Sequence, residues 1–241
     1  MSDPWNYAGP VTQLGSGAGA VTLVDESTFA ISGGAGDIAP GAAQGLFFRD
    51  TRILSRFEVL VNGVPAEPLA AVNDDPFSAT FVSRNLPAPG RADSTLMVFR
   101  QRHVGQGMRE ELILRNFGDE ATVCSVDILV DADFADLFAV KEGRVVADAH
   151  HGSVTTDVVD GHVGTHGGDR VPSLTYTYSR GAVARGVEIR AVDAHRVVPG
   201  LVTFEVVVPA RGEWSTCIEV GPVINGEVFA PKYRCGEPVE R

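Results

Sequence analysis

Acidic and basic side chains gather at two places where a predicted strand begins or ends. The first is segment 49–52 (RDTR), which follows three apolar residues, and the second is segment 131–136 (DADFAD), which follows an apolar strand. Clustered carboxylates can bind a hard cation such as Ca²⁺, or act as the acid and base of a glycoside-cleaving enzyme. Segment 131–136 lacks the glycine and the distal glutamate of an EF-hand loop, and one strand end does not establish the separation of two catalytic carboxylates. The plainer interpretation is that its aspartates accept hydrogen bonds from backbone amides or pair with arginines.

Segment 49–52 places two arginines and an aspartate beside apolar residues, and this pattern is consistent with two arrangements. Arginine suits bidentate, partly desolvated pairing with carboxylates, and a buried charge without a partner is strongly destabilising. One arrangement is a salt-bridge cluster inside the domain, and the other is a contact surface for a partner. The residues of this candidate ionic network or interface are Arg49, Asp50, Arg52, Asp131, Asp133 and Asp136, with Glu110 and Glu111 as further possible pairing partners.

The other motifs predict no catalytic residue, metal ligand or cofactor. Four histidines lie in a glycine-rich stretch without an HExxH motif or cysteine partners, which favours a solvated loop over a metal site: His150, His151, His162 and His166. No G-x-S-x-G motif marks a hydrolase nucleophile. The glycines of segment 15–19 precede a predicted strand rather than a helix, so they do not form a phosphate cradle. Trp5 and Trp214 are the candidates for stacking on a sugar ring, and each stands alone.

The elements that must position these residues are strands. Segment 52–61 alternates and predicts one strand, with Ile53, Ser55, Phe57, Val59 and Val61 on one face. It ends at Asn62-Gly63, a pair that tolerates the positive φ of a type I′ hairpin turn.

Further short strands follow at regular spacing with glycine and proline turns between them. Segments 95–104, 108–116 and 122–130 predict three consecutive strands of an antiparallel meander, and segment 214–220 is expected to pair back with segment 201–208. Segment 141–171 predicts weak strands or long loops at an edge. No window of eleven or more residues has clean helical periodicity. The sequence therefore predicts an all-β protein, an antiparallel β-sandwich with little helix.

Composition narrows the class of partner. The 241 residues carry a formal net charge of −11, which argues against nucleic acid or an anionic membrane surface. The first residues lack a basic and an apolar region, so no signal peptide is expected, and no apolar run is long enough to span a bilayer.

The three cysteines are widely spaced without a CxxC motif: Cys124, Cys217 and Cys235. This spacing predicts reduced thiols and a cytoplasmic protein.

Three segments together resemble the N-terminal domain of bacterial glycogen-debranching-type enzymes, which are amylo-α-1,6-glucosidase-like proteins. The segments are 40–55 (PGAAQGLFFRDTRILS), 109–117 (REELILRNF) and 130–138 (VDADFADLF). Their order and spacing extend the resemblance over about residues 20–220. Each motif alone is weak, but the set is fairly specific to the family.

The resemblance implies a supersandwich-like domain that precedes a helical-toroid catalytic domain in the same polypeptide. The family's catalytic carboxylates lie in the toroid and have no matching positions here, so this chain is expected to be non-catalytic. The implied activity of the whole enzyme is hydrolysis of α-1,6-glucosidic branch points in glucans. The expected organisation is a flexible lead (1–19), the β-sandwich (20–220) and a tail (221–241) towards the catalytic domain. The alternative is a stand-alone carbohydrate-binding module for α-glucans.

Overall fold

Alternating burial along the strands shows how this sequence builds two-faced sheets. β8 (Ser78–Arg84) and β9 (Leu96–Val104) bury every second residue, because successive side chains of a strand point to opposite faces. The computed structural model describes residues 19–87, 94–144, 153–159, 171–180 and 183–239, which form three antiparallel sheets. The prediction of an all-β antiparallel sandwich with little helix is confirmed. The described residues contain one short helix, α1 (Leu137–Lys141).

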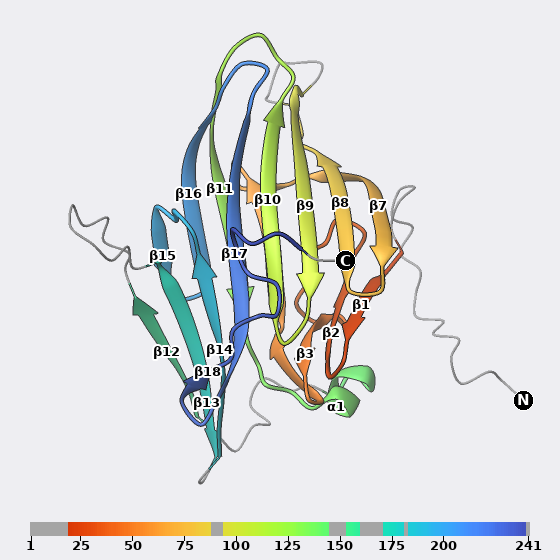
Figure 1. Ribbon diagram of the computed structural model, residues 1–241, viewed down its shortest axis with the longest axis vertical. Helices are drawn as coiled ribbons and strands as arrows, with labels where there is room; N and C mark the ends of the chain where they lie inside the picture. The colour runs from red at the N-terminus through yellow and green to blue at the C-terminus, as the bar shows by residue number, and fades with distance from the viewer. Residues whose placement is uncertain (1–18, 88–93, 145–152, 160–170, 181–182, 240–241) are drawn as a thin grey trace, which may run out of the picture.

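The largest sheet has nine strands and forms the front layer in Figure 1. Its order is β12 (Ser153–Val159), β13 (Ser173–Arg180), β14 (Val183–Ala191), β17 (Glu213–Ile224), β10 (Met108–Asn116), β9, β8 and β7 (Glu67–Asp75), with β18 (Glu227–Val228) paired to β17.

Two smaller sheets complete the sandwich. The five-stranded sheet has the order β15 (Arg196–Val198), β16 (Leu201–Val208), β11 (Thr122–Asp131), β5 (Arg56–Val61) and β6 (Val64–Pro65). The four-stranded sheet has the order β1 (Val21–Asp25), β2 (Thr28–Ser32), β3 (Gly45–Phe48) and β4 (Thr51–Leu54). One hydrophobic cluster joins all three sheets, with members such as Leu23, Ile128 and Leu112.

The segment predicted as one strand over 52–61 is two strands in different sheets. β4 pairs with β3, whereas β5 pairs with β11, and the chain passes between the sheets at Ser55. The Ser55 amide donates to the carbonyl of Asp131 (2.8 Å) and so leaves the strand ladder. The predicted alternation is confirmed in β5, where Phe57, Val59 and Val61 are buried, but all four residues of β4 are buried. The hairpin turn is also present, with positive φ at Asn62 and Gly63.

The predicted meander of segments 95–104, 108–116 and 122–130 is wrong for its third strand. β9 pairs with β10, but the other neighbour of β10 is β17, and β11 lies in the five-stranded sheet. The predicted pairing of segment 214–220 with 201–208 is also wrong, because the chain crosses from β16 to β17 in the other layer. The Asn116 side chain shapes the β10–β11 crossover by binding the Gly118 amide (2.9 Å) and the Glu120 carbonyl (2.8 Å). A short crossover and a hairpin turn have similar sequences, so their residues did not distinguish them.

The cysteine prediction is wrong for two of the three residues. Cys217 and Cys235 form a disulfide with Cα atoms 5.8 Å apart, and the free thiol of Cys124 is buried. The spacing of the three cysteines did not show that the chain turns back after β17 and returns over it. Residue 220, the expected end of the sandwich domain, lies within β17, which runs to Ile224.

Some expectations concern parts of the chain outside the described residues. These are almost all of the lead (1–19), with Trp5, and the four histidines His150, His151, His162 and His166. Across the described ranges, no helix has the length and apolar character needed to cross a membrane.

Candidate functional site

Arg49 and Asp50 form the two-residue turn between β3 and β4. Their φ angles are 46° and 63°, which suits a type I′ turn, although neither is the glycine or asparagine typical of that position. Both side chains are exposed, and the Arg49 guanidinium lies over the Phe48 ring, 5.1 Å from its centroid. Because water solvates these two charges, they do not require the buried partners that the sequence led us to expect.

Arg52 is buried and makes the ion pair that links the two charged segments. Only 4% of the residue is exposed, and its guanidinium binds both carboxylate oxygens of Asp133. The remaining nitrogen, Nη1, donates to the carbonyls of Gln44 (3.0 Å) and Ala42 (3.3 Å). Its backbone amide donates to the carbonyl of Ala135 (2.9 Å). Arg52 therefore fastens the four-stranded sheet to the segment that follows β11.

A glycine in β3, Gly45, leaves space for the side chain of Arg52. A Cβ atom on Gly45 would lie 2.5 Å from Cδ of Arg52 and 3.0 Å from the carbonyl oxygen of Leu54. Such distances are shorter than van der Waals contact, so any larger residue would displace the arginine stem. The glycine and the arginine of segment 45–52 are therefore coupled by packing.

The other two aspartates of segment 131–136 bind backbone amides. Asp131 accepts from the amide of Ala132 (2.8 Å), and Asp136 caps α1 by accepting from the amide of Phe138 (2.9 Å). An N-cap carboxylate satisfies one of the amides left free at a helix start. The aspartates of segment 131–136 therefore bind backbone amides or an arginine, which is the plainer of the interpretations given for them above. In the part of the chain that the structure describes, no three His, Cys, Asp or Glu side chains group to hold a metal ion.

A second ionic cluster lies deeper in the core and joins Glu110 to two arginines, Arg100 and Arg102, that sequence reasoning did not single out. Glu110 pairs with both Arg100 (2.5 Å) and Arg102 (2.5 Å), and Arg100 also pairs with Asp37. Glu110 is 1% exposed and Arg102 is 0% exposed. Both guanidiniums also donate to the carbonyl of Gly36, at 3.1 Å and 2.6 Å. Glu110 therefore does not reach segment 49–52, and Glu111 pairs instead with Arg109 (3.2 Å).

Burial and charge oppose each other in the protonation of this cluster. Burial alone would raise the pKa of Glu110, but the adjacent guanidiniums of Arg100 and Arg102 outweigh it, and the pKa is lowered. Desolvation lowers the pKa of Arg102, and the Glu110 carboxylate opposes this change. For Arg100, the attraction of Glu110 and Asp37 outweighs desolvation, so its pKa is raised. The cluster is thus an ionised, paired group inside the sandwich.

A signal for this cluster was present in the alternation of β9 and β10. Leu96, Val98, Arg100, Arg102 and Val104 share the buried face of β9. On the neighbouring strand, Glu110 lies directly opposite Arg102. Charges of opposite sign at matched positions on two apolar faces predict a buried pair, because an unpaired buried charge would be too costly.

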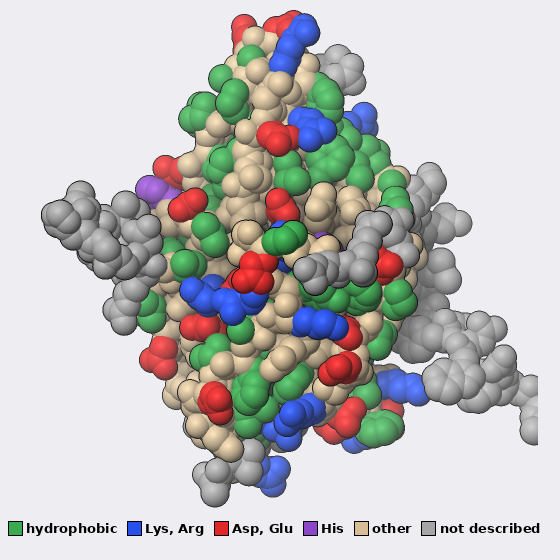
Figure 2. Space-filling model, viewed as in Figure 1, with side chains coloured by type: hydrophobic (Ala, Val, Ile, Leu, Met, Phe, Trp, Pro, Cys, Tyr) green, Lys and Arg blue, Asp and Glu red, His purple; other side chains and the backbone are tan. Residues whose placement is uncertain are grey.

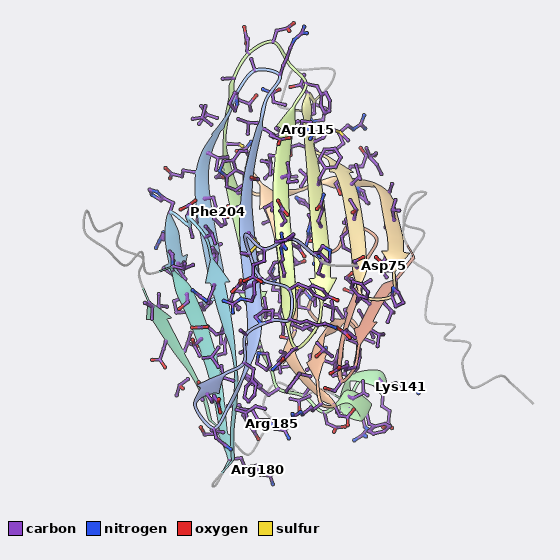
Figure 3. All side chains as sticks on the ribbon, viewed as in Figure 1. Asp75, Arg115, Lys141, Arg180, Arg185 and Phe204 are labelled. Carbon is purple, nitrogen blue, oxygen red and sulfur yellow. A yellow bond between two sulfur atoms is a disulfide. The ribbon has the colours of Figure 1, made fainter. Side chains whose placement is uncertain are left out.

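The remaining candidate for sugar stacking, Trp214, packs inwards. Its ring lies edge to face against Phe204 with centroids 5.5 Å apart, and the two residues belong to β17 and β16, which lie in different sheets. At the lower end of Figure 3, Arg185 of β14 reaches the hydroxyl of Thr51 in β4. The large sheet thus also touches the strand that carries Arg52.

The family model of the N-terminal domain of some glycogen debranching enzymes matches residues 23–219. The chain belongs to this family. The two segments joined by Arg52 and Asp133, and the β10 segment that carries Glu110, all lie within the matched range. The matched range therefore includes residues that hold the sheets of the sandwich together. No curated protein matches the chain.

Solved structures with a similar fold include a galactose mutarotase-like protein and a putative kojibiose phosphorylase. A galactose mutarotase-like protein from Lactobacillus casei is 8% identical with a TM-score of 0.50, over 85% of this chain and 100% of that one. At this identity the likeness shows the fold alone. A putative kojibiose phosphorylase from human microbiome is 11% identical with a TM-score of 0.45, over 85% of this chain. The matched part spans only 30% of the length of that phosphorylase.

Proposed function

We propose that this chain is the non-catalytic N-terminal β-sandwich domain of a glycogen-debranching-type glycoside hydrolase. The observation that carries the proposal is the family match over residues 23–219. The whole enzyme would hydrolyse α-1,6-glucosidic branch points in glucans. A helical-toroid catalytic domain of the same polypeptide would supply the acid and the base, and the sandwich would pack against it and position it.

The occupation of the clustered carboxylates supports a non-catalytic role. A glycosidase needs one carboxyl group that can give up a proton and a second that faces the sugar or a water molecule. Asp133 is held by Arg52, and Asp136 caps a helix. Glu110 is buried between two guanidiniums that keep it ionised. These carboxylates stabilise the fold and are not free to act on a substrate.

The turn at Arg49-Asp50 and the start of α1 form an exposed surface that suits a docking domain. The carbonyl of Asp50 accepts from the amide of Leu137 (3.0 Å), so turn and helix are adjacent. Phe138 on α1 is 62% exposed, and Arg49 and Asp50 are also exposed. We call Arg49, Asp50 and Phe138 the turn–helix surface. Exposed aromatic and arginine side chains are typical of the residues that contribute most to an interface.

The test is a titration of this chain with the separately expressed catalytic region of the same enzyme. We expect a measurable complex, and Phe138→Ala should weaken it by about tenfold or more. The matched control is Phe117→Ala, because Phe117 is 60% exposed and follows β10 at the opposite end of the sandwich. Loss of binding in both variants, or no complex with the unaltered chain, would contradict the proposal.

Calorimetry with maltooligosaccharides and a branched glucan separates this proposal from a stand-alone carbohydrate-binding module. Sugar-binding modules stack sugar rings on exposed aromatic side chains, and binding would release or absorb measurable heat. We expect a flat titration for the isolated chain. A saturable heat signal that survives Phe138→Ala would favour the stand-alone module instead.

A further inference from the structure

The C-terminal segment lies across the outer face of the nine-stranded sheet. In Figure 1 it leaves β18 and passes in front of β10 and β9. Strand β17 is buried continuously from Ile218 to Val223, without the alternation of β8 and β9. One face of these residues meets the core, so the other face must be covered by the returning chain. Figure 2 shows acidic and basic side chains intermixed on this side of the molecule.

The first part of this segment is seated by backbone contacts. The amide of Phe229 donates to the carbonyl of Pro222 (2.8 Å), and the amide of Lys232 donates to the carbonyl of Gly105 (2.7 Å). A Cβ atom on Gly221 would collide with the carbonyl oxygen of Phe229, so the strand has a glycine where the chain lies against it. We call residues 229–233 the seated part.

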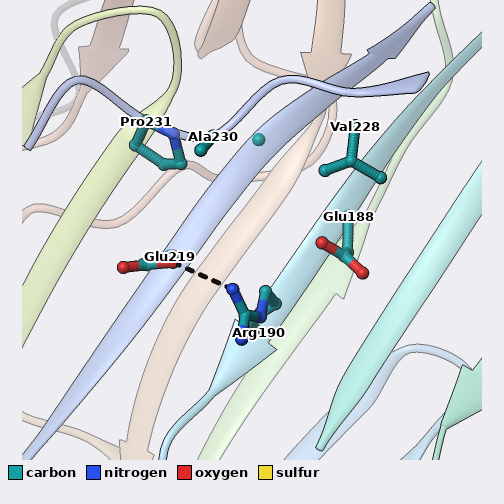
Figure 4. Close-up of a pocket in the computed structure, with 7 residues that line it drawn as sticks. Glu188, Arg190, Glu219, Val228, Ala230 and Pro231 are labelled. Carbon is teal, nitrogen blue, oxygen red and sulfur yellow. Dashed lines mark ion pairs between the residues drawn. The ribbon is translucent and has the colours of Figure 1, made fainter. Parts of the chain in front are cut away.

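The second part, residues 234–237, is held by side chains. The Glu219 carboxylate accepts from the Arg234 guanidinium (3.1 Å) and from the amide of Cys235 (2.8 Å). Glu219 also pairs with Arg190 at 3.6 Å, as the dashed line in Figure 4 marks. Within the described residues, the disulfide between Cys235 and Cys217 is the only covalent cross-link between this part and β17.

Few polar contacts hold the second part besides the disulfide. The Arg109 guanidinium donates to the carbonyl of Glu237 (2.9 Å). The Arg234 side chain is 35% exposed, and partly exposed ion pairs contribute about 1 kcal/mol or less. The disulfide closes a loop over a sequence separation of 18 residues, and both cysteines are only partly buried. We propose that the Cys217–Cys235 disulfide is a redox latch that fixes residues 234–237 on the sheet and releases them when it is reduced.

The chemistry of the latch is thiol–disulfide exchange with a dithiol reductant. One thiolate of the reductant attacks one sulfur of the Cys217–Cys235 bond, which forms a mixed disulfide and releases the other cysteine as a thiolate that takes up a proton. The second thiolate then displaces the protein sulfur, so the reductant becomes a cyclic disulfide. Two electrons and two protons pass to Cys217 and Cys235, which end as thiols.

Amide hydrogen exchange tests the latch, because the two parts each offer a probe. The Cys235 amide reports the latched part, and the Lys232 amide, bound to Gly105, reports the seated part. On addition of dithiothreitol, exchange at Cys235 should become about tenfold faster or more, while exchange at Lys232 should change little. The Cys217→Ser/Cys235→Ser variant should behave like the reduced protein without added reductant.

Cys124 supplies the control for specificity. It is buried, and burial raises the pKa of its thiol, so it should resist alkylation while the reduced latch cysteines react. Cys124→Ala should leave both exchange rates unchanged. Equal protection of the Cys235 amide in oxidised and reduced protein would overturn the latch. So would loss of the circular dichroism of the whole sandwich on reduction, because the disulfide would then support the fold rather than one segment.

Discussion

Asp133 and Asp50 show how burial decides what an aspartate contributes. Asp133 holds the guanidinium of Arg52, whose side chain is 5% exposed. Asp50 lies in an exposed turn with φ of 63°. A charge in water gains little from a partner, whereas a buried guanidinium that loses its carboxylate pays the cost of desolvation.

Asp133→Asn should therefore destabilise the sandwich by about 2–3 kcal/mol, measured as the free energy of unfolding in urea. The side chain of Asp133 is 24% exposed, so water would partly solvate the orphaned arginine and limit the loss. Asp50→Asn makes the same chemical change at a position where asparagine tolerates the positive φ, and it should stay within about 0.5 kcal/mol. Equal effects of the two substitutions would show that Arg52 does not depend on its carboxylate.

At the scale of elements, the bend between β4 and β5 brings the charged segments together. Because the chain changes sheets at Ser55, Arg52 belongs to one sheet and faces the segment that leaves another. Gly45 is needed for the same contact, since its missing side chain leaves the space for the arginine stem.

Gly45→Ala should destabilise the protein by about 1–3 kcal/mol, because Arg52 is held by its hydrogen bonds and does not move aside easily. Gly33→Ala is the matched control. A Cβ atom there would meet its nearest atom at 3.7 Å, an ordinary contact, so the change should stay within about 0.5 kcal/mol. Thermal unfolding of both variants provides the comparison, and an unchanged Tm for Gly45→Ala would contradict the packing argument.

The local pattern predicted most strands but not their neighbours. Alternation and turn residues were sufficient for β5 and its hairpin at Asn62-Gly63, because both signals are local. The partner of β10 depends on contacts between distant segments, and residues 117–121 have the composition of a turn whether the chain returns or crosses. The Arg49-Asp50 turn lacked the usual asparagine or glycine. For the candidate site, charge density located Arg52 and Asp133, but only the fold showed that Asp133 is the carboxylate that pairs with it.

For the whole molecule, the buried cluster of Glu110 connects parts of all three sheets. Its arginines lie on β9, its glutamate on β10, and the chain around Gly36 leads from β2 towards β3. The Phe57 ring of β5 lies 5.7 Å from the guanidinium carbon of Arg102. Protonation of one carboxylate would therefore weaken contacts across the sandwich.

Glu110→Gln should cost about 3–5 kcal/mol at neutral pH, because it leaves two buried guanidiniums without their shared carboxylate. Glu111→Gln, which changes a half-buried neighbour on β10, should cost about 1 kcal/mol or less.

The pH dependence of the unfolding free energy tests the ionisation of Glu110 directly. Since the pKa of Glu110 is lowered in the folded protein, its contribution is full above the ordinary value of 4.5 and is lost as the pH falls through the lower folded value. The difference in unfolding free energy between wild type and Glu110→Gln should thus be constant from about pH 7 to pH 5 and shrink as the pH falls below the ordinary value of 4.5. Urea unfolding of both proteins at each pH measures it, and a difference that stayed constant into acid would show that Glu110 is not the ionised centre of the cluster.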